Sequence, residues 1–169
     1  APTLRSRCQR LNFSVPDQEM AETWLEQVSP GINATMALRD SAGAPLAALK
    51  ARESGALELR SAWRDQLYAL AAQRIDPISA ASKVDKDGAA VWLRAFMGLL
   101  REILRGLAGV DAEPRALALS HRLGAAHVEQ LLAEAVESQR RLQSNANPQL
   151  IIESLMISWW RRTAPSDKR

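Results

Sequence analysis

Apolar side chains recur at three- and four-residue spacing along almost the whole chain, which is the periodicity of amphipathic helices and not of strands. Strand-forming residues are sparse after Val15, and aromatic residues make up only 5% of the 169 residues. Alanine and leucine, which favour helices, are abundant. The pattern therefore predicts an all-α protein.

Short helices are expected in the first third of the chain. Ser14 can cap the first of them, Asn33 the second, and Pro45 can occupy the first position of a third helix that ends at Gly55. We expect these three helices to form a small bundle over residues 14–55.

The predicted helices lengthen beyond Gly55, where we place a domain boundary. They are expected at about 56–74, from a cap at Asp87 to Gly109, at 114–122, at 125–143, and from Asn147 to 163. Residues 56–163 should form a larger helical bundle. The polar tail 164–169 is expected to be disordered.

Composition limits the function classes. The chain is 47% hydrophobic, has no apolar run long enough for a membrane span, and carries one cysteine, so we expect a cytoplasmic protein without an internal disulfide, a membrane partner or a cysteine-based zinc site. The net charge is only +3, although the pI is near 9.5. Charge alone therefore does not indicate nucleic-acid binding.

Several isolated features favour structural roles. His121 and His127 are too far apart to share a helical face as metal ligands, so no metal or other cofactor is expected. An arginine stripe at 94, 101 and 105 could contact phosphates, but a solvated helix face explains it better. Trp159 and Trp160 point about 100° apart on a helix, which favours core or interface tryptophans over base stacking.

The motif with the clearest chemistry is Ser6-Arg7-Cys8, preceded by Thr3, Leu4 and Arg5. It resembles the arginine-finger motif of bacterial clamp-loader subunits of the AAA+ class. The resemblance implies that residues 1–13 end a nucleotide-binding domain and that the chain is a C-terminal part of such a subunit. Arg7 would be the finger, with Ser6 and Cys8 as its motif neighbours. A trans arginine stabilises the charge on a phosphoryl group held by the adjacent subunit.

A second match lies near the other end. Asn147-Pro148-Gln149-Leu150 and the apolar helix after it resemble the Asn-Pro-Gln-Leu signature of clamp-loader collar domains, although a helix cap followed by proline also accounts for the pattern. The resemblance implies an AAA+ lid at 14–55 and a collar oligomerisation domain at 56–163. Its interface residues are expected at Leu150, Ile151, Leu155 and Trp159.

The sequence of the expected lid distinguishes between the types of clamp-loader subunit. ATP-hydrolysing gamma or tau subunits carry a sensor arginine in a string similar to Gly-Ser-x-Arg-Asp-Ala-Leu, and here residues 43–49 place Leu46 at that position. A finger without a sensor favours a stator subunit that does not hydrolyse ATP. Two alternative interpretations stay open: a gamma or tau ATPase subunit, and an unrelated helical adaptor in which both motifs are coincidental.

The resemblance also implies a set of partners. They are the gamma or tau and delta subunits of DNA polymerase III and, through the complex, the sliding clamp and primer-template DNA. The holoenzyme is a nucleotidyltransferase, but this chain shows no phosphate loop, nucleophile elbow or carboxylate pair of its own. We therefore expect it to act on a neighbour's active site.

Overall fold

The computed structural model describes residues 14–144 and 146–165, and these form eight α-helices without a strand. An all-α fold is thereby confirmed. The chain divides into two compact units, with the boundary between Ser54 and Gly55. The predictions for residues 1–13 and for 166–169 lie outside the described residues.

The first unit contains three helices, each of which contacts the other two: α2 (Gln18–Val28), α3 (Ala34–Asp40) and α4 (Pro45–Glu53). Asn33 caps α3 as predicted, since its side-chain oxygen accepts a hydrogen bond from the Met36 amide at 3.1 Å. The prediction for α2 is wrong by one turn. Asp17 and not Ser14 is its cap, and it accepts the Met20 amide at 2.9 Å.

Small side chains fill the interior of this unit. The buried residues are Ala21, Leu25, Ala34, Ala37, Leu38, Ala48 and Ala51. Alanine at so many contact positions lets short helices approach closely. Between α3 and α4 the backbone of Gly43 adopts φ +80°, where a side chain would be strained, and its amide bonds to the Leu38 carbonyl at 2.8 Å.

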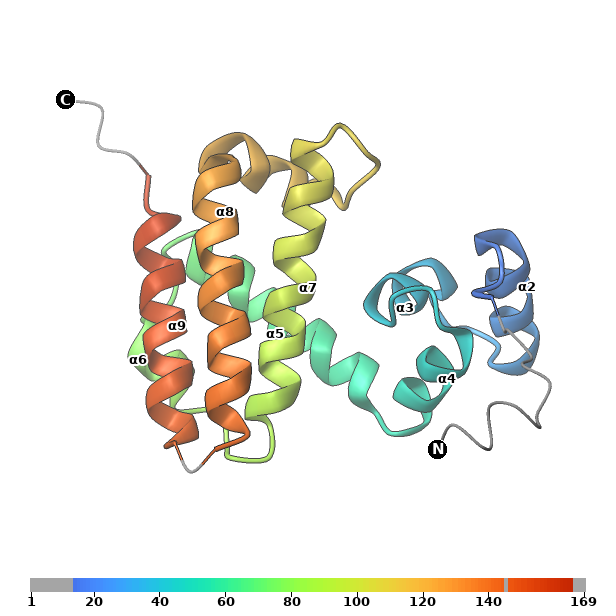
Figure 1. Cartoon of the computed structure of the whole chain (residues 1–169), viewed down its shortest axis with the longest axis horizontal. Coiled ribbons are helices and arrows are strands. Elements are labelled where there is room, and N and C mark those ends of the chain that lie inside the picture. The colour runs from blue at the N-terminus through green and yellow to red at the C-terminus, as the bar shows by residue number, and fades with distance from the viewer. Residues whose placement is uncertain (1–13, 145, 166–169) are drawn as a thin grey trace, which may run out of the picture. The chain divides into compact units, whose positions relative to one another are not determined.

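The second unit is a bundle around α7 (Ala89–Leu107), which contacts α5 (Ala56–Ala71), α8 (Pro114–Leu142) and α9 (Pro148–Arg162). The short helix α6 (Pro77–Ala81) packs on α9. Figure 1 shows α7, α8 and α9 side by side with nearly parallel axes, and α8 runs opposite to the other two. α7 carries the broad apolar face that its sequence predicts, with Trp92, Phe96 and Ile103 fully buried.

Aromatic rings occupy the centre of this bundle. Phe96 stacks on Trp92 with ring centroids 5.3 Å apart, and Trp159 meets Phe96 edge-on at 5.6 Å. The Trp159 indole N–H donates to the Leu67 carbonyl at 2.9 Å, which joins α9 to α5. Since Trp159 is completely buried, both its apolar surface and its hydrogen bond contribute to the bundle.

The helix ends differ from prediction in two places. α6 lies between the predicted helices at 56–74 and from Asp87, where none was expected. Asp76 caps it by accepting the Ser79 amide at 2.7 Å. α7 begins after Gly88 and not at a cap at Asp87, and Asp85 accepts the Gly88 amide.

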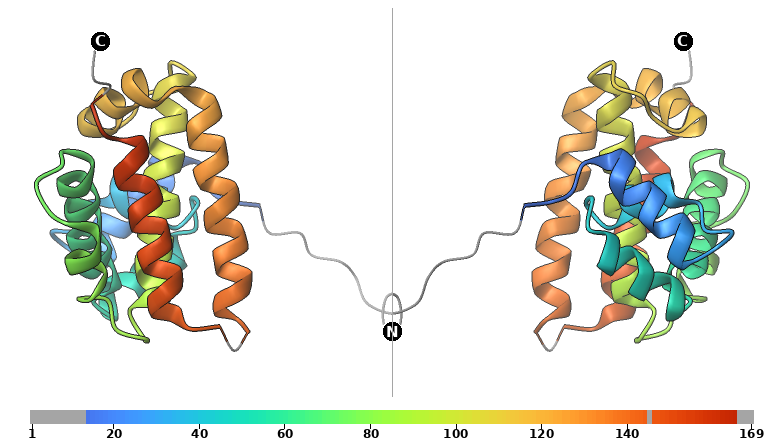
Figure 2. Two further views of the ribbon diagram at one scale, coloured as in Figure 1. Left: turned by 90° about the vertical axis from the view of Figure 1, so that its left-hand side faces the viewer. Right: turned by 90° about the vertical axis from the view of Figure 1, so that its right-hand side faces the viewer.

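The predicted break after Arg122 is present as a kink within α8. Gly124 there has φ +69° and ψ +161°, outside the helical region. The segment before Gly124 runs across the end of the bundle, at an angle to the rest of α8 (Figure 2). The kink gives α8 two directions, and the segment before it forms one wall of a pocket.

Candidate functional site

A pocket of about 320 Å³ lies in the second unit between α5 and the first segment of α8. Its apolar lining consists of Ala69, Ala71, Ala72, Ala118 and Leu119. These small side chains leave the space open, because none of them reaches far from its helix. The pocket is large enough for one or two side chains of a ligand.

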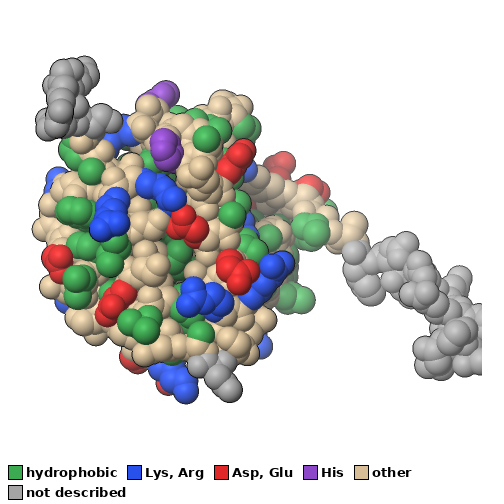
Figure 3. All heavy atoms as spheres, turned by 60° about the vertical axis from the view of Figure 1, so that its left-hand side comes forward, with side chains coloured by type: hydrophobic (Ala, Val, Ile, Leu, Met, Phe, Trp, Pro, Cys, Tyr) green, Lys and Arg blue, Asp and Glu red, His purple; other side chains and the backbone are tan. Residues whose placement is uncertain are grey.

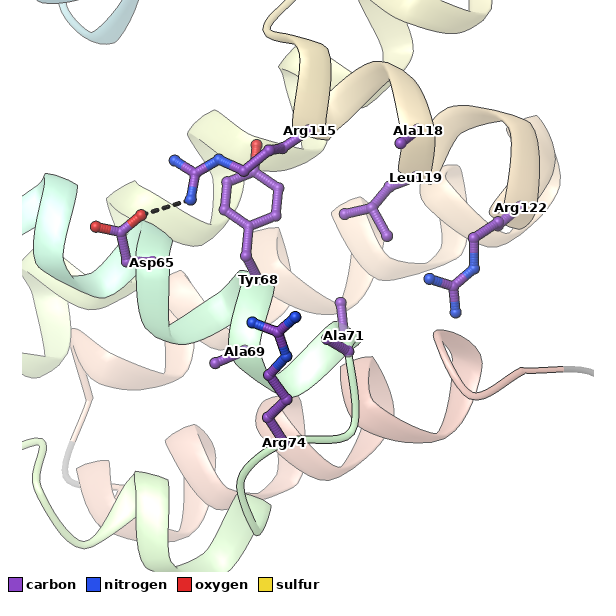
Figure 4. Close-up of a pocket in the computed structure, with 10 residues that line it drawn as sticks. Asp65, Tyr68, Ala69, Ala71, Arg74, Arg115, Ala118, Leu119 and Arg122 are labelled. Atoms are coloured by element: carbon purple, nitrogen blue, oxygen red, sulfur yellow. Dashed lines mark hydrogen bonds and ion pairs between the residues drawn. The ribbon is translucent and has the colours of Figure 1, made fainter.

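The polar lining residues are Asp65, Tyr68, Arg74, Arg115 and Arg122. Figure 4 shows the Arg115 guanidinium beside the Tyr68 ring, the Arg74 guanidinium extending toward Tyr68, and Arg122 beyond Leu119. Three guanidinium groups around one small pocket favour an anionic ligand, since an arginine presents five donors and no acceptor.

Two helical stripes face each other across this pocket. Along α5 and its C-cap one wall is formed by residues 65, 68, 69 and 72, with Ala71 also in the lining, and along α8 the other is formed by residues 115, 118, 119 and 122. Both sets have the i, i+3, i+4, i+7 spacing of one helix face. Each wall of the pocket is therefore one face of a helical segment.

Arg115 is held by three neighbours. Its guanidinium contacts the Asp65 carboxylate at 2.7 Å and the Glu113 carboxylate at 2.8 Å, and its central carbon lies 4.1 Å from the centroid of the Tyr68 ring. The Tyr68 hydroxyl donates to the other Glu113 oxygen at 2.9 Å. These contacts lock Arg115 and one face of the Tyr68 ring into the wall.

The electrostatics of this corner keep Tyr68 neutral. Burial and, after it, the negative charge of Glu113 raise the pKa of the Tyr68 phenol far above its usual range. Tyr68 is therefore a hydrogen-bond donor at any physiological pH and does not serve as a base. The corner is a structural support.

Arg74 and Arg122 keep donors available. The Arg74 side chain is exposed and makes no hydrogen bond or ion pair within 14–144 and 146–165, and Arg122 uses one terminal nitrogen on the Thr163 carbonyl. The remaining guanidinium donors of both residues can bind a ligand. The anion-binding part of the pocket is thus its Arg74 and Arg122 side.

The residues predicted from sequence lie elsewhere. Ser6, Arg7 and Cys8 are outside the described residues. Leu150 is 60% exposed, whereas Ile151, Leu155 and Trp159 are buried in the bundle core. Of the four predicted interface residues, Leu150 alone has an exposed side chain, and the interface itself stays a prediction.

Both histidines, His121 and His127, are exposed. Among the described residues no group of three His, Cys, Asp or Glu side chains could hold a metal ion. Within the same ranges, no helix has the length and apolar character needed to cross a membrane. On the face drawn in Figure 3, acidic and basic side chains are interspersed, with apolar ones scattered between them.

The pocket was missed because sequence analysis weighed each helix alone. The signal that could have found it is the pair of arginines at 115 and 122, two turns apart on a helix that also carries Ala118 between them. That spacing predicts one basic face with a gap at its centre. Nothing local in the sequence indicates that α5 lies opposite.

Family comparison assigns the class of this bundle. Residues 54–161 match the family model for the C-terminal part of the delta subunit of DNA polymerase III, a range that covers nearly all of the second unit. The chain belongs to this family of clamp-loader subunits. It is also 26% identical over 148 residues to the delta' subunit of DNA polymerase III from Haemophilus influenzae. That match covers 85% of this chain and 45% of the relative, so the chain spans less than half of that protein's length.

Proposed function

We propose that the chain functions as the stator of a DNA polymerase III clamp loader, as a subunit of the delta prime type. The similarity to the Haemophilus delta' subunit over 85% of the chain is the observation that carries this proposal. The family match over residues 54–161 argues against an unrelated helical adaptor.

Each unit then has a role. The helices of 14–55 act as the lid that follows a nucleotide-binding domain, and the bundle of 56–163 joins neighbouring subunits in the collar. Arg7, with Ser6 and Cys8 beside it, supplies a finger to the ATP site of the adjacent subunit. The chain itself holds no cofactor in this scheme.

Leu46 supports the absence of ATP hydrolysis. It lies in the first turn of α4, and its side chain is 71% exposed. An arginine there could extend toward a nucleotide, but a leucine has no donor to offer a phosphate. This disfavours the alternative of a gamma or tau ATPase.

The partners follow from the same proposal. They are the gamma or tau and delta subunits, with the sliding clamp and primer-template DNA reached through the complex. Binding of ATP by the neighbours would let the assembly open the clamp, and primed DNA would trigger hydrolysis. The stator contributes Arg7 and a rigid collar contact to this cycle.

The test is ATP turnover in a clamp loader reconstituted with the full-length protein, in the presence of clamp and primed DNA. Arg7→Ala and Arg7→Lys should each assemble normally and lose a large share of the stimulated hydrolysis, on the order of a thousandfold at the affected site. Arg7→Lys should also lose activity, because lysine lacks the planar guanidinium group of arginine. Arg5→Ala is the matched control. Unchanged turnover in an intact Arg7→Ala complex would remove the finger from the proposal.

A further inference from the structure

We propose that the pocket between α5 and α8 binds an acidic segment of a partner protein, with one apolar side chain seated between the two helices and flanking carboxylates on Arg74 and Arg122. The proposal concerns the second unit alone and does not depend on Arg7. It assigns a ligand class to a site that the stator function leaves unused.

The apolar lining selects a ligand with an apolar side chain. Ala69, Ala72 and Ala118 present methyl groups to the pocket, and Leu119 adds a larger apolar surface. A volume of about 320 Å³ accommodates a leucine or phenylalanine side chain with room for its backbone. Removing such a side chain from water supplies affinity that a purely ionic contact would not.

The charged rim selects the flanking residues. Arg74 has all its guanidinium donors available, and Arg122 keeps those that the Thr163 carbonyl does not use. In Figure 4 Arg122 lies across the pocket from the Asp65–Arg115 pair, and the Arg74 guanidinium lies below the Tyr68 ring. A carboxylate beside each of Arg74 and Arg122 would complete charge-assisted hydrogen bonds.

The same geometry disfavours nucleic acid. Single strands bind through bases stacked on exposed aromatic faces, but Arg115 already covers a face of the only aromatic ring in the pocket, that of Tyr68. Asp65 and Glu113 lie where a continuous phosphate backbone would pass the Arg115 corner. A short acidic peptide avoids both obstacles.

The first experiment measures binding of a fluorescein-labelled peptide, a single leucine between two pairs of glutamates, by anisotropy with the whole chain. Arg74→Glu should weaken binding about tenfold, because it removes one attraction and adds a repulsion. It should fold normally, since the Arg74 side chain makes no hydrogen bond among the described residues. Arg101→Glu is the matched control: an exposed arginine of the same unit that does not line the pocket.

A second pair of variants tests the apolar lining. Ala118→Phe fills the pocket and should abolish binding, whereas Ala133→Phe adds the same ring at an exposed position of the same helix and should leave it intact. A peptide with glycine in place of the leucine should bind at least tenfold more weakly. Circular dichroism of each variant should match that of the unmodified chain, as the check that its helices are kept.

The outcomes decide the proposal. Equal losses in Arg74→Glu and Arg101→Glu would show general charge attraction and overturn it. Undiminished peptide binding by Ala118→Phe would also overturn the proposal, and so would the absence of saturable peptide binding. Preference for a short oligothymidylate over the peptide would assign the site to nucleic acid instead. Loss specific to Arg74→Glu and Ala118→Phe, with both controls intact, supports it.

Discussion

Trp159 offers the sharpest test of how the second unit is held together. It is fully buried, meets Phe96 edge-on and donates to the Leu67 carbonyl. Trp159→Phe keeps an aromatic ring at this position but removes the donor and part of the ring. Trp160→Phe makes the same change one residue later, at a half-buried side chain on the edge of the core.

The structure sets the expected size of the effect. Loss of the buried N–H···O bond costs about 1 kcal/mol, and the smaller ring leaves a void that adds roughly 1–2 kcal/mol. Trp159→Phe should therefore lower the free energy of unfolding by about 2–3 kcal/mol. Trp160→Phe should cost less than about 1 kcal/mol, because its position is partly open to solvent and needs no buried partner.

The assay must report on this unit alone, because the chain has two. Native-state hydrogen exchange of the slowest amides in α5 and α7 does so, since those amides exchange only when the bundle opens. The two variants should differ by about 1 kcal/mol or more in this measurement. Equal losses, or a loss below about 0.5 kcal/mol for Trp159→Phe, would refute the argument that burial and the Leu67 hydrogen bond set its contribution.

Three further substitutions probe the same bundle. Arg162, and after it Ser158, hold the pKa of Glu134 below its usual range. This stabilisation is present above the unfolded carboxyl pKa of about 4.3 and is lost as pH falls through the lower folded pKa. In urea titrations, Glu134→Gln should therefore reduce the change in unfolding free energy between about pH 5 and 3 by at most about 1 kcal/mol. Gly106→Leu should cost about 1–3 kcal/mol by thermal unfolding, because even a Cβ there would lie 3.1 Å from the Ser120 hydroxyl. Asn147→Ala should cost about 1 kcal/mol by removing the cap on the Gln149 amide, with Asn147→Asp as the control that keeps it.

The presence of most helices and many of their ends were predictable because they depend on local signals. Asn33 and Asn147 are caps whose amide partners lie two or three residues away, and Gly109 ends α7 in the left-handed region. The failures are also local. At Ser14 and Asp87 a better-placed acceptor nearby, Asp17 or Asp85, takes the amide.

The site was not predictable in the same way. The apolar residues of α9 suggested a partner surface, but Ile151 and Leu155 face the protein's own core. A single sequence shows that a side chain is apolar but not which neighbour covers it. The pocket was missed because a single sequence does not show which distant polar residues meet. Asp65 and Arg115, which are in contact, are fifty positions apart in the chain.

Gly124 connects the local signal to the distant site. Every α8 residue that lines the pocket, from Arg115 to Arg122, precedes this glycine. A continuous helix would carry that segment along the axis of 125–142, whereas φ +69° and ψ +161° at Gly124 turn it across the end of the bundle. Residues other than glycine rarely adopt this backbone conformation. The sequence therefore shows where α8 must bend, and the direction of the bend, which only the fold provides, brings the α8 arginines opposite α5.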